Sequence, residues 1–196
     1  MRAAFEDAAA ALLTTIEQIE PHQWELPGLG VWSVRELAAH TLRALTTIEK
    51  YLVAEPSVDR LIVDAIDYYR VALADSRVHA SVADRGRAAG AELTDPVGEC
   101  QATTEQVLAL VASTADDDVV ETSAGKMMFI EYLATRATEL GLHTLDLQRA
   151  TGQPLCLPPA TSAMVVGLMA ALADPIMLLS ALTGRGELPP DYNVLR

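Results

Sequence analysis

Two histidines and one glutamate have residue types and a spacing that suit metal binding. Glu139 and His143 lie four residues apart in a segment with helical character, and residues at i and i+4 share one face of a helix. His40 lies about a hundred residues earlier, in another apolar helical segment. A histidine from a facing helix would complete a set of three ligands with an open position, which is typical of a catalytic metal rather than a structural one. The pattern favours a metal-dependent enzyme.

Each of these three residues also has a simpler interpretation. Glu139 and His143 can form an exposed i,i+4 pair worth a few tenths of a kcal/mol, and His40 can be a hydrogen-bonded core histidine. The chain has four histidines, and these two lie in its most strongly helical apolar segments, whereas the other two lie in polar contexts. Because of this placement, the spacing supports a metal site as strongly as it supports the simpler interpretations.

The helix face that carries the glutamate and the second histidine holds further polar residues, at Tyr132, Arg136 and Asp146. Asp146 is a candidate fourth ligand. It could equally accept a hydrogen bond from a ligand histidine or pair with Arg35 or Arg43.

Arg136 and Tyr132 have two interpretations each. Arg136 would place a positive charge near the site for a substrate carboxylate, or it would form an ion pair with Glu139 or Glu131. Tyr132 would line the pocket or pack in the core. Both residues are therefore candidates for substrate binding or for supporting the metal ligands.

Composition and charge bound the class of protein. Of the 196 residues, 51% are hydrophobic but only 5% are aromatic, and the abundance of Ala and Leu favours helices over strands. An all-α fold is expected. The net charge of −13 argues against nucleic acid and against anionic membranes as partners.

Cysteine usage and hydropathy predict a cytoplasmic protein. Only Cys100 and Cys156 occur, without metal-type spacing, so a disulfide scaffold is not expected. The acidic residues near the N-terminus argue against a signal peptide. The apolar segment 160–183 is interrupted by Asp174 and Pro175, so neither half is long enough to span a membrane. We expect two short buried helices there.

Apolar periodicity and start and stop signals place the helices. Ser33 with Glu36 forms a candidate capping box, Pro96 suits a first helical position, and Gly152 suits a helix end. The polar, acidic run 114–125 is expected to be a loop. The predicted helices are approximately 2–19, 34–52, 58–74, 78–93, 96–112 and 127–150, followed by the short helices of 160–183.

Two segments, 31–40 and 131–147, resemble the mycothiol-dependent maleylpyruvate isomerase family, which belongs to the DinB-like group of metal-binding four-helix bundles. The resemblance implies an all-α, DinB-like four-helix bundle with extra helices between bundle helices two and three and with short C-terminal helices. The bundle would occupy residues 1–152, and 153–196 would form a short helical extension packed on the bundle or at a homodimer contact. It also implies that His40, Glu139 and His143 are the metal ligands.

The same resemblance implies a reaction class. A divalent metal, with zinc preferred, would activate mycothiol or a similar small thiol for transfer to, or isomerisation of, a small electrophilic substrate. The founding isomerases carry a larger C-terminal domain, and about 45 residues follow the bundle here, so maleylpyruvate isomerisation itself is not expected to carry over.

Two alternatives remain open. The chain could be a non-catalytic metal-binding bundle with a regulatory or protein-interaction role. Alternatively, the two histidines and one carboxylate could form a non-haem iron oxygenase site.

Overall fold

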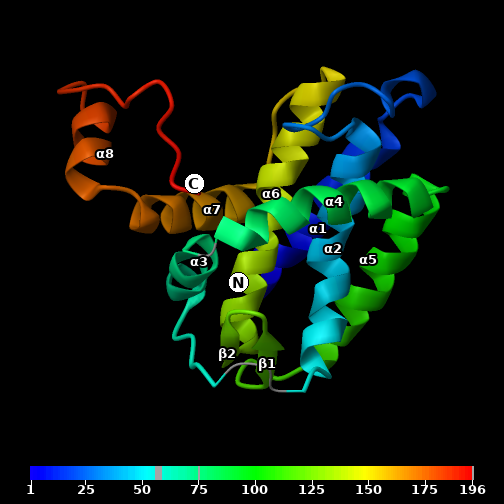
Figure 1. The fold of residues 1–196 in the computed structure, drawn as a ribbon, viewed down its shortest axis with the longest axis horizontal. Helices are drawn as coiled ribbons and strands as arrows, with labels where there is room; N and C mark the ends of the chain where they lie inside the picture. The colour runs from blue at the N-terminus through cyan, green and yellow to red at the C-terminus, as the bar shows by residue number, and fades with distance from the viewer. Residues whose placement is uncertain (56–58, 75, 196) are drawn as a thin grey trace.

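Four long helices form a bundle in the computed structural model, which describes residues 1–55, 59–74 and 76–195 but no side chains of 76–82. In this bundle α1 and α2 each contact both α5 and α6, and α6, the longest, lies beside α1 in Figure 1. The all-α fold is thus confirmed. The bundle helices are α1 (Arg2–Glu17), α2 (Val34–Leu52), α5 (Pro96–Ser113) and α6 (Phe129–Thr151).

The signals that begin and end these helices lie where the sequence predicts them. The Ser33 side chain accepts a hydrogen bond from the Glu36 N–H and the Glu36 carboxylate accepts one from the Ser33 N–H, which completes the capping box of α2. Asp95 caps α5 ahead of Pro96. Gly152 ends α6 at φ +72°, a left-handed conformation that favours glycine.

Two additional helices connect α2 to α5, as predicted. They are α3 (Ala65–Leu73) and α4 (Ser76–Glu92), and α4 packs across α2 while α3 contacts α6. The predicted helix 58–74 was too long, and position 58 itself lies outside the described residues. The helix begins only after Asp64, whose carboxylate accepts from the Asp67 N–H, because the preceding backbone is hydrogen-bonded to Lys126 instead.

A β-hairpin occupies most of the run predicted as a loop. Strands β1 (Val119–Thr122) and β2 (Gly125–Met128) pair antiparallel, and α6 therefore starts at Phe129 rather than at 127. The loop prediction holds for 114–118 but was wrong for 119–125, because the acidic residues before the hairpin obscured the alternating burial of Val120 and Thr122. The Thr122 hydroxyl accepts from the Ala124 and Gly125 N–H groups and closes the turn.

The two C-terminal helices differ in burial. On α7 (Pro159–Leu172), Thr161, Val165 and Leu168 are buried, and the helix contacts α1 and α6. On α8 (Pro175–Leu182) no residue is buried, and the helix projects from the bundle in Figure 1. The prediction of two buried helices was therefore wrong for α8. It inferred burial from apolar composition alone, and composition does not determine whether a helix packs against the rest of the chain.

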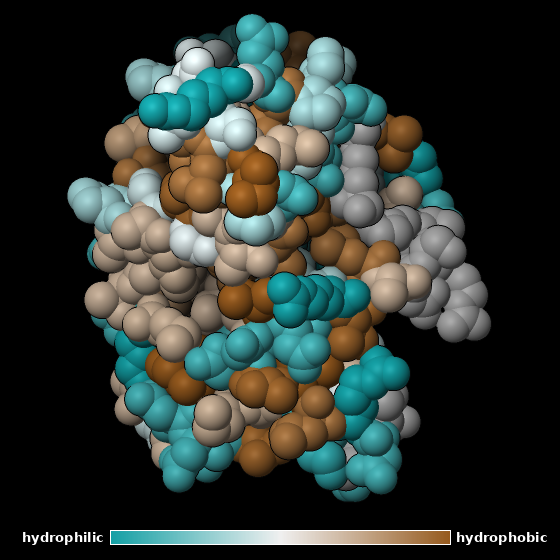
Figure 2. Space-filling model, turned by 90° about the vertical axis from the view of Figure 1, so that its left-hand side faces the viewer, coloured by the Kyte–Doolittle hydropathy of each residue, from teal (hydrophilic) through white to brown (hydrophobic). Residues whose placement is uncertain are grey.

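The side of the molecule that carries α8 combines exposed apolar residues with polar ones. Figure 2 shows this side, where hydrophobic surface is interspersed with polar groups. The exposed fractions of Ile176, Leu179 and Leu182 are 71%, 58% and 74%. None of the helices in the described parts of the chain has the length and apolar character needed to cross a lipid bilayer.

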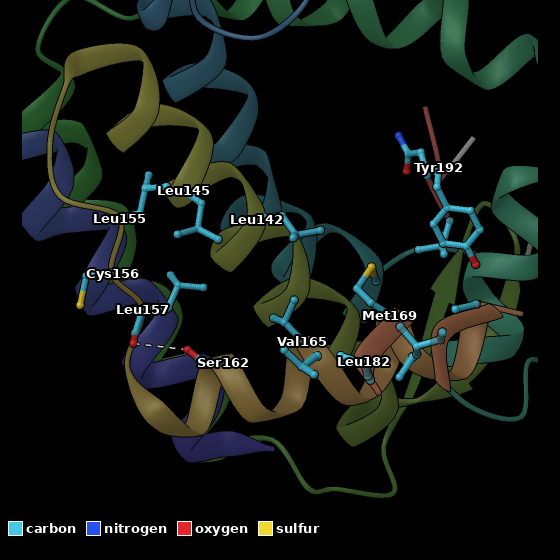
Figure 3. Close-up of a pocket in the computed structure, with 16 residues that line it drawn as sticks. Leu142, Leu145, Leu155, Cys156, Leu157, Ser162, Val165, Met169, Leu182 and Tyr192 are labelled. Atoms are coloured by element: carbon cyan, nitrogen blue, oxygen red, sulfur yellow. Dashed lines mark hydrogen bonds between the residues drawn. The ribbon is translucent and has the colours of Figure 1, made fainter. Parts of the chain in front are cut away.

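A large cavity of about 590 Å³ lies between α6, α7, α8 and the C-terminal segment, and we call it the apolar groove. Figure 3 shows leucines of α6 and of the α6–α7 connection facing Val165 and Met169 of α7. Its hydroxyls already have partners within the chain. Ser162 donates to the Leu157 carbonyl at 3.3 Å, and the Tyr192 hydroxyl accepts from the Asp174 N–H at 3.0 Å.

Candidate metal centre

The three candidate ligands converge between α2 and α6. One ligand atom from each of His40, Glu139 and His143 can be chosen so that all lie within 4.8 Å of one another. The His143 Nε2 lies 3.5 Å from a Glu139 carboxylate oxygen, and the two imidazole centroids are 5.1 Å apart in a T-shaped arrangement. Residues about a hundred positions apart in sequence therefore meet in a volume that fits one ion.

Trp32 and α4 position His40. The indole and the imidazole lie with ring centroids 4.4 Å apart, and the indole Nε1 donates to the Ala83 carbonyl of α4 at 3.0 Å. A Cβ at Gly86 would lie 2.5 Å from the indole ring, so glycine is required for α4 to lie this close. Trp32 thus packs against one face of the His40 ring and fixes its position independently of any bound ion.

The environment of His40 disfavours its protonated form. Its Nδ1 is buried and has no hydrogen-bond partner among the described residues. Burial, followed by the charge of His143, lowers the pKa of His40 to about 4. A neutral imidazole with an unpartnered nitrogen is the form that ligates a metal.

The carboxylate of Glu139 is held ionised by its neighbours. Burial alone would raise its pKa, but the hydrogen bond with His143, the charge of Arg136 and the hydrogen bond from Tyr69 lower the pKa to about 2. The Tyr69 hydroxyl donates to one carboxylate oxygen at 2.8 Å. That bond fixes the carboxylate and leaves its other oxygen on the side of His143.

Asp146 orients His143. Its carboxylate lies 3.3 Å from the imidazole Nδ1 and accepts from Arg149 at 3.2 Å. Burial alone would lower the pKa of His143, but the hydrogen bonds with Asp146 and Glu139 raise it to about 9. A carboxylate on the second ring nitrogen is the usual support of a ligand histidine, since it fixes the tautomer and raises basicity.

The donor set fits a divalent cation. Two imidazoles and one carboxylate are a common ligand set for a catalytic metal, and His40 offers a buried nitrogen with no other partner. Glu139 and His40 already have the protonation states that ligation needs. His143 must lose a proton on binding, which makes metal affinity dependent on pH.

A cavity of about 360 Å³, here called the site pocket, opens beside the three candidate ligands. Its walls come from α2, α3, α4 and α6, and they include three arginines among several aromatic residues. The charged and aromatic lining residues besides the ligands are Trp32, Arg43, Tyr51, Tyr68, Tyr69, Arg85 and Arg136.

The other residues singled out in the sequence have distinct places. Asp146 contacts His143 and does not pair with Arg35, which donates to Glu25 instead. Arg136 lines the site pocket. Tyr132 is fully buried, hydrogen-bonded to Thr47 and absent from the pocket wall, which matches the packing interpretation.

Sequence reasoning missed Tyr69, Tyr68 and the role of Trp32 toward His40. Tyr69 belongs to an amphipathic stripe on α3, where an aromatic residue indicates only burial. Trp32 precedes α2 and was interpreted as a core anchor. The signal for these contacts is not local, because each joins segments that are distant in the chain.

One of three comparisons with known proteins found a family that matches this chain. The family model described as mycothiol maleylpyruvate isomerase N-terminal domain matches residues 1–148. That range includes all four bundle helices up to Gln148 and all three candidate ligands. Searches of curated proteins and of solved structures gave no match.

Proposed function

The chain belongs to the mycothiol maleylpyruvate isomerase N-terminal domain family, and from this premise we propose that it is a metal-dependent enzyme that uses a small thiol of the mycothiol type to modify a small electrophile. The observation that carries the proposal is the convergence of His40, Glu139 and His143 within 4.8 Å beside an open pocket. His40, Glu139 and His143 would hold the ion, with zinc favoured because nitrogen and oxygen donors and an open position suit it.

The ion and the protein would divide the chemistry between them. A divalent cation held by these three residues would lower the pKa of a thiol bound beside it, so that the thiol proton passes to solvent, and the thiolate is the nucleophilic form. The sulfur then forms a bond to the electrophilic carbon. In a substitution the leaving group departs with the bonding electrons, and in an addition a proton from solvent goes to the neighbouring carbon.

The protein residues orient the reacting groups. Tyr69 fixes the Glu139 carboxylate, Asp146 fixes the His143 ring, and Trp32 holds the His40 ring. We assign these roles to a bundle unit at 1–152 and regard 153–196 as an extension that packs on it through α7.

Thiol consumption tests the proposal. The zinc-loaded protein is mixed with chlorodinitrobenzene or a maleimide and with mycothiol, glutathione or cysteine, and the remaining thiol is measured over time. We expect metal-dependent turnover with at least one thiol, and its loss in His143→Ala. Leu145→Ala, on the same helix but in the apolar groove, is the matched control and retains turnover.

A negative result has a specific consequence. If the protein binds metal through these residues but consumes no thiol with any pair, the enzyme assignment is wrong and a non-catalytic metal-binding bundle takes its place.

A further inference from the structure

The apolar groove has no part in the proposed thiol chemistry, yet its volume of about 590 Å³ lies in the range of cavities that bind a small organic molecule. In Figure 3, leucines of α6 and of the α6–α7 connection face Val165 and Met169 of α7. Helix α8 and the C-terminal segment complete the lining with residues such as Leu182 and Tyr192. The chemistry of this lining indicates which class of molecule the groove would bind.

The groove offers no charge to a ligand. Among the described residues that line it, none is charged. No Asp, Glu, Lys, Arg or His occurs from 150 to 173, and Asp174 is the only one from 150 to 184, although 21% of the whole chain is charged. The Asp174 carboxylate accepts from the Met177 N–H at the start of α8 and is not part of the lining. A charged ligand would therefore lose hydration in the groove without gaining a counter-charge.

The hydroxyl and amide side chains of the lining already have partners within the chain. The Ser162 hydroxyl donates to a carbonyl of the α6–α7 connection at 3.3 Å, and the Tyr192 hydroxyl accepts from the Asp174 N–H at 3.0 Å. The side-chain oxygen of Asn193 accepts from the backbone N–H two residues further on, at 2.8 Å. Polar groups engaged in this way contribute little to the orientation of a polar ligand, so the lining favours an apolar one.

The C-terminal segment closes one side of the groove and favours a small molecule over a second protein chain. Tyr192, Asn193 and Val194 line the groove, and the hydrogen bond from the Asp174 N–H to the Tyr192 hydroxyl ties this segment to the start of α8. The volume of about 590 Å³ is present with the segment in place, so a small molecule needs no rearrangement. A helix is about 10 Å wide with its side chains, and a helix of a second chain would have to displace the segment.

We propose that the apolar groove binds a small uncharged apolar molecule, of the class of aromatic hydrocarbons and short hydrocarbon chains. Leu155 and Leu182 line the groove and remain 56% and 74% exposed, so a ligand that covers them removes apolar surface from water. The net charge of −13 adds a field that disfavours anions. The groove thus selects its ligand by the absence of charge and by shape.

The first test uses the full wild-type chain and an uncharged dye, phenylnaphthylamine, whose fluorescence rises in an apolar environment. Titration should give saturable binding. Naphthalene and naphthalenesulfonate, which share one ring system and differ by a charged group, then compete for the dye. Naphthalene should displace it, and naphthalenesulfonate should compete at least about tenfold less well. This comparison needs no variant and therefore does not depend on how a substitution folds.

Two neighbouring alanines of α7 assign the dye to the groove. Ala170 lines the groove, whereas Ala171 is exposed and does not. Ala170→Phe fills part of the cavity and should weaken dye binding by about tenfold or more, while Ala171→Phe should bind the dye as the wild type does. Ala173→Phe, at another lining position, provides a second filling variant. Circular dichroism checks that each variant is folded.

The outcomes decide the inference without reference to the proposed thiol chemistry, because no candidate metal ligand lines the groove. An absence of saturable binding, equal competition by the sulfonate, or full dye affinity in a folded Ala170→Phe or Ala173→Phe variant would each overturn it. A wild type that elutes as a dimer in size-exclusion chromatography and binds the dye only after dissociation would assign the groove to a second copy instead.

Discussion

The site pocket and the apolar groove share one wall, because α6 lines both of them. That helix presents Arg136, Glu139 and His143 to the first cavity and Leu142 and Leu145 to the second. The groove is larger, at about 590 Å³ against about 360 Å³, yet its hydroxyls have partners within the chain. Among the described residues, the smaller cavity holds a buried imidazole nitrogen that has no hydrogen-bond partner, beside the buried guanidinium of Arg136. Unsatisfied polar groups, rather than volume, mark the site.

The largest expected effect is on metal content, and it distinguishes the two faces of α6. His143→Ala should reduce bound metal from about one ion per chain to near zero, because it removes a ligand outright, whereas Leu145→Ala should retain the ion. Elemental analysis after zinc loading and dialysis measures this. Equal metal in both variants would mean that the three side chains are not a metal site.

The pH dependence of the metal-free protein tests the electrostatics of the site pocket. The pKa of His40 is about 4 in the folded chain, whereas an unperturbed histidine, as in the unfolded chain, has a pKa of 6.5. Between pH 4 and pH 6.5 the unfolded chain therefore binds more protons than the folded chain. The stability from neutral His40 is present above pH 6.5 and is lost as the pH falls toward 4. The loss should be on the order of 2–3 kcal/mol.

Chemical denaturation at several pH values measures that loss. His40→Gln should remove much of the dependence, while His22→Gln, at an exposed histidine, should leave it intact. A wild-type stability that does not change across this range would contradict the burial of a neutral His40.

A smaller effect on metal affinity is expected from Asp146, which contacts a candidate ligand without being one. Asp146→Asn removes the charge that orients His143 and should weaken metal affinity by about 10–100-fold without abolishing it. Competition with a chromophoric chelator gives the affinity. Loss of all metal would identify Asp146 as a ligand, and unchanged affinity would limit it to its contact with Arg149.

The smallest effect is expected on stability, from a substitution on the exposed helix α8. Leu179→Ser on α8 should change the free energy of unfolding by less than about 0.5 kcal/mol, because the side chain is already 58% exposed. Leu168→Ser, at a buried position of α7, is the matched control and should destabilise the chain clearly. If Leu179→Ser were equally damaging, α8 would be covered in solution.

Much of the fold followed from local sequence. The capping box at Ser33, the start at Pro96 and the end at Gly152 are signals carried by a few neighbouring residues, and the structure has all three. The hairpin was missed because its alternation spans only four residues in each strand, and short patterns compete poorly with a polar run.

What the sequence by itself determined is the content of each helix face: Glu139 and His143 share a side of α6 because the helical repeat places i and i+4 together. Only the tertiary structure decided the rest. It brought His40 to that pair, placed Tyr69 on a carboxylate 70 residues away, buried Arg136 in the wall of the site pocket and left every residue of α8 unburied. These outcomes depend on how distant helices pack and where connecting segments lead, and no local period encodes that packing.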